Sequence, residues 1–227
     1  MGKMENDQEE FSSRAVEPSH HIQNTQESIR LSLPDGRVDT QVKGSMLLGY
    51  VKTIRANKQM DWGQYLRPSD WEIIQGSVLA STWYPFEFFC RLGIAIFKEV
   101  AHYDLNRVRE FGRRNIQEIL QIYKNIVVPG NPQQSLLNLA EHQEMLMQGN
   151  PSMKAISLSP QSVRYRIHAS LDPVERPLLE AFCYQMAGGA EVTAERAGGQ
   201  EVTSRVLPAG DSFELEVSWK SEDWISL

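Results

Sequence analysis

The residues with the most chemical potential lie in one short segment that combines aromatic rings with a carboxylate, a thiol and a guanidinium. Residues 83–91 read Trp-Tyr-Pro-Phe-Glu-Phe-Phe-Cys-Arg. Glu87 and Arg91 are four residues apart, so on a helix they would face each other. A carboxylate buried among rings has a displaced pKa and can serve as an acid or a base. Glu87 with Arg91 or Cys90 is therefore the best candidate site for an unrecognised enzyme.

The rings of the same segment point to a different chemistry, the binding of an apolar molecule. Five aromatic residues in the seven positions 83–89 exceed the number that one helix face can bury. One interpretation is a core that meets both a sheet and helices, and the other is a cavity or a dimer interface lined by the rings. The predicted ligand-binding residues are Trp83, Tyr84, Phe86, Phe88, Phe89 and Phe97.

Motifs of the common enzyme and cofactor classes are missing from the sequence. It contains no GxxxxGK[ST] loop, no GxGxxG turn, and no HExxH or GxSxG signature. The histidines are His20, His21, His102, His142 and His168. Their spacing predicts no metal site, and a haem ligand at His102 or His142 has no supporting motif. We therefore predict no catalytic residue, no metal and no cofactor.

Arginines of one segment form the only basic cluster. They are Arg107, Arg109, Arg113 and Arg114. The cluster could bind an anion or an acidic partner. However, Glu110 and Glu118 each lie four residues from Arg114, so we expect a solvated helix face whose charges neutralise one another.

Composition indicates a single domain with a substantial core. The chain has 227 residues, of which 41% are hydrophobic, and a net charge of −6, which argues against a dedicated nucleic-acid binder. Charged residues, among them Glu87, Arg91 and Lys98, interrupt the longest apolar stretch, residues 78–100, so we predict no membrane span. We interpret Cys90 and Cys183 as small buried hydrophobes. Free cysteines and the absence of an export signal predict a cytoplasmic protein.

Two parts of the chain differ in composition. Residues 1–40 carry four bases against eight acids and few large apolar side chains, so we predict a disordered or loosely attached acidic tail. Residues 41–227 are predicted to form one domain. Its helical half shows apolar residues at helical spacing, with a capping box at Ser69–Glu72 and a helix cap at Asp104. The predicted helices cover residues 42–57, 68–78, a segment from Pro85, 104–127 and 132–147.

Beyond residue 150 the pattern alternates with a period of two, which predicts strands. The predicted strands cover residues 154–158, 162–169, 190–197, 201–207 and 212–219. A helix over residues 173–186 is inserted among them, and Gly188-Gly189 is expected to end it. We therefore predict an α+β fold in which an N-terminal helical half packs on a C-terminal antiparallel sheet with one inserted helix.

Four segments carry a resemblance to known proteins. They are Lys43-Gly44-Ser45, Ser81 to Phe86, Phe111-Gly112-Arg113, and Gly210-Asp211 to Trp219. In this order they resemble a paralogous family of myxobacterial proteins over about residues 42–219. More distantly, the chain resembles four-vinyl-reductase-type and haem-nitric-oxide-binding-like ligand-binding domains. The resemblance implies an α+β sensor domain, often dimeric, with a pocket between helices and sheet, and it implies no activity.

The leading functional hypothesis is a non-catalytic regulatory or sensory domain. It would bind a small apolar or aromatic ligand, or a protein partner, and signal through a homodimer or through the tail. One alternative is a structural or scaffold protein that recognises partners through an apolar patch or the acidic tail. The other is the unrecognised enzyme centred on Glu87. A cavity of a few hundred Å³ lined by the rings would favour the ligand hypothesis.

Overall fold

The computed structural model of the protein describes residues 40–148, 151–168 and 176–220. The helices in these ranges are α1 Gly44–Ala56, α2 Pro68–Gln75, α3 Phe86–Glu99, α4 Leu105–Ile122, α5 Pro132–Leu146 and α6 Arg176–Arg196, with short 3₁₀ turns η1 Trp62–Gln64 and η2 Lys124–Ile126. The strands are β1 Gln41–Lys43, β2 Trp83–Pro85, β3 Met147–Gln148, β4 Ser152–Ser159, β5 Ser162–His168, β6 Gln200–Ala209 and β7 Ser212–Lys220. This arrangement confirms the predicted α+β class.

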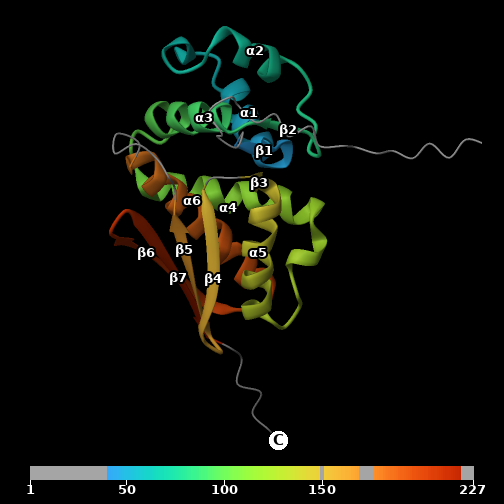
Figure 1. The fold of residues 1–227 in the computed structure, drawn as a ribbon, viewed down its shortest axis with the longest axis vertical. Helices are drawn as coiled ribbons and strands as arrows, with labels where there is room; N and C mark the ends of the chain where they lie inside the picture. Colours follow the sequence, from blue (N-terminus) through green and yellow to red (C-terminus); the bar gives the residue numbers. More distant parts are fainter. Residues whose placement is uncertain (1–39, 149–150, 169–175, 221–227) are drawn as a thin grey trace, which may run out of the picture. The chain divides into compact units, whose positions relative to one another are not determined.

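The larger sheet is antiparallel, with strand order β4-β5-β7-β6. Tyr165 pairs with Leu215, and both side chains are buried on the inner face together with Trp219. Helices α5 and α6 pack against the sheet, as Figure 1 shows. The hydroxyl of Tyr165 donates to the carbonyl of Leu136 in α5 at 2.8 Å, which joins the two layers. The alternating pattern of the last strand therefore predicted its inner face correctly.

The outer face of the sheet carries charges that pair across strands. Arg164 and Arg166 of β5 form ion pairs with Glu216 and Glu214 of β7. Arg205 of β6 adds a second contact to Glu216 at 2.9 Å. Cross-strand pairs of opposite charge favour this register over one shifted by a residue.

A second, smaller sheet was not predicted. Strands β2 and β3 pair with the two edges of β1, antiparallel in both cases. Val42, at the centre of β1, is fully buried. This sheet fixes the start of α1 and the start of α3, because each helix follows one of its strands directly.

The end of α6 differs from the prediction. The helix continues through Gly188 and Gly189 to Arg196, so the strand expected over residues 190–197 is absent. A Cβ atom at Gly188 would lie 2.0 Å from the carbonyl oxygen of Arg109 in α4. The glycines therefore do not end the helix, and Gly188 instead permits a close contact between two helices.

Helix starts were predicted in part. Asp104 caps α4 as expected, because its carboxylate accepts from the backbone amides of Asn106 and Arg107. The capping box predicted at Ser69–Glu72 is wrong. Helix α2 starts at Pro68 as predicted, but its N-cap is Arg67, whose backbone amide donates to Asp70 at 2.8 Å. Pro68 occupies the first turn, where its missing N–H costs no hydrogen bond.

The acidic tail predicted over residues 1–40 lies outside the described residues except for Thr40. The carbonyl of Thr40 accepts from the backbone amide of Phe86 at 3.0 Å. The tail and its boundary stay predictions. In the ranges that the structure covers, no helix combines the length and the apolar character needed to cross a bilayer.

Candidate functional site

Helices α1, α3, α4 and α6 surround a cavity of about 390 Å³. This volume lies within the range of small-molecule sites. We call it the aromatic cavity. Its lining consists of Tyr50 and Thr53 of α1; Phe86, Phe89, Cys90, Gly93, Ile96 and Phe97 of α3, with Val100 and Ala101 after it; Asn106, Arg107, Val108, Glu110, Phe111 and Arg114 of α4; Leu178, Leu179, Ala181, Phe182 and Gln185 of α6; and Pro151.

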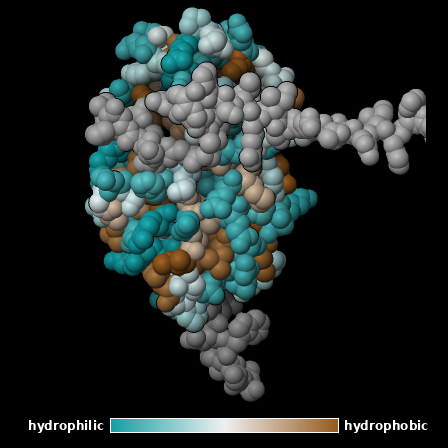
Figure 2. Space-filling view, in the orientation of Figure 1, coloured by the Kyte–Doolittle hydropathy of each residue, from teal (hydrophilic) through white to brown (hydrophobic). Residues whose placement is uncertain are grey.

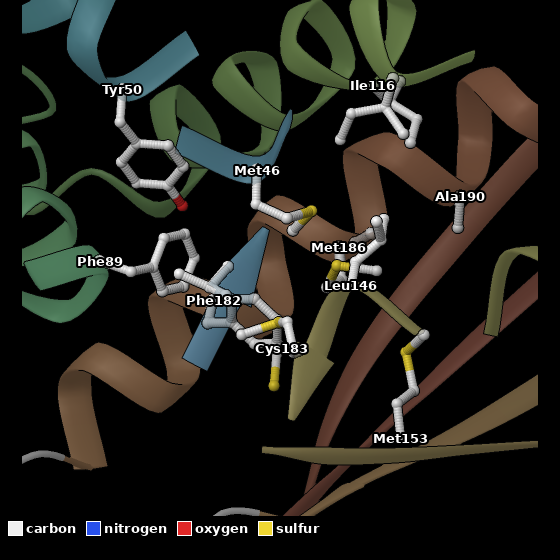
Figure 3. Close-up of a cluster of buried hydrophobic side chains, with 14 of the residues drawn as sticks. Met46, Tyr50, Phe89, Ile116, Leu146, Met153, Phe182, Cys183, Met186 and Ala190 are labelled. Atoms are coloured by element: carbon white, nitrogen blue, oxygen red, sulfur yellow. The ribbon is translucent and has the colours of Figure 1, made fainter. Parts of the chain in front are cut away.

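Rings from four helices meet at the buried end of this cavity. The ring of Tyr50 lies 5.0 Å from those of Phe89 and Phe111, and Phe182 lies 6.3 Å from Phe89. Figure 3 shows Tyr50, Phe89 and Phe182 converging from α1, α3 and α6. Such tilted and edge-to-face pairs are favourable arrangements of aromatic rings. The rings therefore form a preassembled apolar wall.

Three of the six predicted ligand-binding residues line the aromatic cavity. Phe86, Phe89 and Phe97 lie on the face of α3 that points to it. Their spacing of three and eight residues matches one side of a helix with 3.6 residues per turn. The structure therefore brings these three together, and ligand binding by them stays a prediction.

The other three predicted residues lie elsewhere. Trp83 in β2 stacks under the ammonium of Lys43 at 4.0 Å. The hydroxyl of Tyr84 accepts from the backbone amide of Leu79 at 3.1 Å. Phe88 faces away from the cavity and is buried in the core, because its position on α3 is offset from that of Phe89 by one residue. None of the three contributes to the lining.

Sequence reasoning did not identify the partners of these phenylalanines. Tyr50, Phe111 and Phe182 occupy apolar positions of three separate helices, where each reads as an ordinary core residue. Their convergence depends on how the helices pack, which a local pattern does not encode. The signal that the sequence offers is the presence of an aromatic residue on each of three predicted helices.

A buried polar pair forms part of the inner wall. The hydroxyl of Tyr50 donates to Oε1 of Gln185. Burial raises the pKa of Tyr50, although the hydrogen bond with Gln185 acts in the opposite direction. The phenol therefore stays protonated near neutral pH and acts as a hydrogen-bonding group.

The two cysteines have different positions. Cys90 lines the aromatic cavity and is partly buried, whereas Cys183 is fully buried and does not line it. Burial raises the pKa of the Cys183 thiol, so Cys183 is a small core hydrophobe as predicted.

The candidate enzyme site on α3 is not formed. Glu87 has 74% of its side chain exposed, and its carboxylate lies 3.6 Å from a guanidinium nitrogen of Arg91, which is longer than a hydrogen bond. Arg91 instead makes two hydrogen bonds, of 2.7 and 2.8 Å, to the buried carboxylate of Asp70. The Glu87–Arg91 pair is therefore present, but the expected burial of its carboxylate is wrong, because the buried partner of Arg91 is Asp70 of α2. Glu87 is consequently an exposed carboxylate and not the buried one that the enzyme hypothesis needs.

The arginine cluster also pairs differently from the prediction. Arg109 and Arg113 both contact Glu191 of α6, whose side chain is only 6% exposed. Burial alone would raise the pKa of Glu191, but hydrogen bonds from Arg109 and Ser204 hold it below the ordinary value. These arginines therefore join α4 to α6 and do not form a self-neutralised surface.

A much smaller cavity of about 30 Å³ lies between α1, α4, α5 and α6. Four buried polar side chains border it, so we call it the polar chamber: Asn115, His142, Gln143 and Gln185. Oδ1 of Asn115 is buried without a hydrogen-bond partner in the described part of the chain. A space of this size holds about one water molecule. The chamber therefore has room for a single bridging water.

A third hollow, of about 910 Å³, lies between α1, η1 and α2. Its lining includes the charged side chains of Arg55, Lys58 and Asp61. The guanidinium of Arg55 donates to the carbonyls of Ile74 and Gly76, each at 2.6 Å. Small-molecule sites are mainly apolar with a few polar groups. The aromatic cavity matches that description better and is the candidate site.

Comparison with known proteins relates the chain to others by fold. The sequence matches no protein-family model and no curated protein. The structure is similar to an oxygen-binding H-NOX domain related to soluble guanylate cyclases, with a TM-score of 0.51, 12% identity, and coverage of 79% of this chain and 95% of that one. It is also similar to an Fe(II) unliganded H-NOX protein mutant from K. algicida, with a TM-score of 0.53, 11% identity, and coverage of 80% and 98%.

A third similar structure was solved to probe heme distortion in the H-NOX family. Its TM-score is 0.51, with 11% identity and coverage of 79% of this chain and 95% of that one. At these identities the likeness establishes a shared fold. The distant resemblance to haem-nitric-oxide-binding-like domains is therefore confirmed at the level of fold, and the resemblance to the myxobacterial family stays a prediction.

Proposed function

We propose that this protein is a non-catalytic sensory domain whose aromatic cavity binds a small apolar or aromatic molecule. The observation that carries the proposal is a cavity of about 390 Å³ between four helices, walled by Tyr50, Phe89 and Phe182. Burial of apolar ligand surface against such a wall is the main source of affinity in small-molecule sites. The shared fold with H-NOX domains, one of which binds oxygen, supports a sensory role.

Haem does not fit the described residues through a histidine ligand. His102 and His168 are exposed, and neither lines the aromatic cavity. His142 borders only the polar chamber, whose volume of about 30 Å³ is far too small for a porphyrin. Its Nδ1 also lies 2.9 Å from the carbonyl of Asn138. We therefore propose a metal-free organic ligand.

A neutral fluorescent probe tests this function. N-phenyl-1-naphthylamine should bind the full-length protein with a saturable rise in fluorescence and one site per chain. Gly93→Leu should weaken binding at least tenfold, because a Cβ atom at Gly93 has ordinary contacts and the remaining side chain would enter the cavity. Gln117→Leu adds the same side chain at an exposed position of α4 and serves as the control. Equal binding by both variants would contradict the proposal.

Signalling through a homodimer or a protein partner is a second part of the proposal. Strand β4 is an edge of the larger sheet, and it exposes Ile156 and Leu158. Figure 2 shows small groups of apolar residues among polar ones on the visible face. Exposed edge strands can pair with another chain. Native mass spectrometry should detect a dimer, and Ile156→Lys should lower the dimer fraction. A protein that stays monomeric at all concentrations would count against the homodimer.

We also propose a cytoplasmic location, from the sequence alone.

A further inference from the structure

We propose that the ligand of the aromatic cavity is an amphipathic anion whose charged head pairs with Arg114 while its apolar body fills the cavity. This inference rests on the proposed function, because it names the class of ligand that the same cavity would take. The distribution of charged side chains around the aromatic cavity supports this ligand class.

The lining changes from apolar to charged between its buried and exposed ends. Tyr50 and Phe89 are buried at the inner end. Arg107, Glu110 and Arg114 are exposed and line the cavity from α4. Their spacing of three and four residues places them along one face of that helix. A ligand that enters past this face therefore has its apolar part among rings and its last atoms beside charged groups.

Arg114 differs from the other arginines of α4 because nothing in the described ranges forms an ion pair with it. Arg109 and Arg113 are held by Glu191. Glu118, which the sequence offered as a partner of Arg114, pairs with Lys52 of α1 at 2.7 Å. The guanidinium of Arg114 has five N–H donors in a planar fork that matches a carboxylate. It is therefore the group at the cavity that is best suited to an anionic head.

Two carboxylates limit the strength of this attraction. Asp104 lies 3.8 Å from Arg107, so it neutralises part of the positive charge nearby. Glu110 lines the cavity between the two arginines and forms no ion pair in the described part of the chain. Its charge should repel an anionic head. Removal of Arg114 and removal of Glu110 are consequently expected to change the affinity in opposite directions.

The volume sets the size of the ligand. A water molecule occupies about 30 Å³ of the liquid, so the cavity has room for about a dozen groups of that size. Decanoate has about twelve non-hydrogen atoms and a single charge. Its matched neutral analogue is 1-decanol. This pair separates the contribution of the charged head from that of the apolar chain.

The experiment measures how each compound displaces N-phenyl-1-naphthylamine from the full-length protein. Decanoate should bind more tightly than decanol. Arg114→Gln should weaken decanoate about fivefold, as expected for an exposed ion pair, and should leave decanol within twofold. Glu110→Gln should tighten decanoate about twofold. Raising NaCl to 0.5 M should weaken decanoate alone.

Arg196→Gln is the matched control, since Arg196 is an exposed arginine at the end of α6 that does not line the cavity. It should change neither affinity, and circular dichroism melts should show all variants folded. Equal affinities for decanoate and decanol, or equal responses to Arg114→Gln, would overturn the inference and leave the proposed function standing. Failure of the neutral probe itself to bind would overturn both.

Discussion

Helix α4 has two contrasting regions. At Gly112 its contact with α6 has no spare room, because a Cβ atom there would lie 2.0 Å from the carbonyl oxygen of Gln185. Elsewhere the helix borders the aromatic cavity. Gly93 of α3 lies at that cavity, and a Cβ atom there would meet only Leu178 and Tyr50, at 3.4 and 3.9 Å. Glycine thus permits a close helix contact in one region and borders empty space in the other.

The charges of α4 follow the same division. At the α6 contact, Arg109 and Arg113 are satisfied by the buried carboxylate of Glu191. At the cavity, Arg114 has no such partner in the described ranges. The ion pairs of the α4–α6 contact are therefore complete without a ligand, whereas the cavity has unfilled space and, within the described ranges, an arginine without an ion-pair partner. A ligand can therefore bind in the cavity without disrupting the α4–α6 ion pairs.

The largest expected effect comes from Glu191→Ala, which breaks the contact. It leaves two arginine side chains without their shared buried partner, so we expect a loss of about 3 kcal/mol in the free energy of unfolding. Urea denaturation followed by circular dichroism measures it. Glu118→Ala removes the more exposed pair with Lys52 and should cost less than about 1 kcal/mol. Similar losses in both variants would mean that the α4–α6 contact has no special importance.

Gly112→Ala should have the next largest effect. The added methyl group would meet the backbone of α6, which cannot move away as a flexible side chain can. Overpacking of this kind costs about 2 kcal/mol and should force the two helices apart. The same urea titration measures the loss. A variant as stable as the original protein would show that the contact is looser than the distances indicate.

The contribution of Glu191 to the free energy of unfolding should depend on pH. Because the pKa of Glu191 is below its ordinary value of 4.5 in the folded state, the unfolded chain takes up the proton at a higher pH. The stabilisation by the carboxylate is therefore complete above about pH 4.5 and is lost as the pH falls through the folded pKa. The original protein should lose its advantage over Glu191→Gln in this acidic range. A difference that stays constant down to pH 3 would contradict the assignment.

The two regions also show what the sequence could predict. The cap of α4 at Asp104 and the inner face of β7 were predicted because each depends on residues close together in the chain. The path of α6 through Gly188 was not, since glycine weakens an isolated helix. The close contact of Gly188 with the backbone of Arg109 depends on tertiary packing. Local rules therefore fail at the closest helix contact.

The candidate site was predicted in the same partial way. Phe86, Phe89 and Phe97 share one face of α3, so their common direction follows from helical spacing. Tyr50 and Phe182 lie far away in the sequence and meet Phe89 only through helix packing. The pairing of Arg91 with Asp70, a residue of another helix, has the same origin. Partners across helices are the part that no periodicity encodes.

Gly93→Ala should have the smallest effect on the free energy of unfolding. The sign of this change should be opposite to that of Gly112→Ala. Alanine favours a helix interior over glycine, and the new methyl group would have ordinary contacts at the cavity wall. We expect a gain of about 0.5 kcal/mol in the free energy of unfolding. Measured in the same titration as Gly112→Ala, the identical substitution should thus stabilise one helix and destabilise the other. The neutral probe should bind with less than a twofold change, because one methyl group occupies little of the cavity. A loss of stability at Gly93 would mean that the wall of the cavity is as closely packed as the α4–α6 contact, and the distinction between the two regions would then fail.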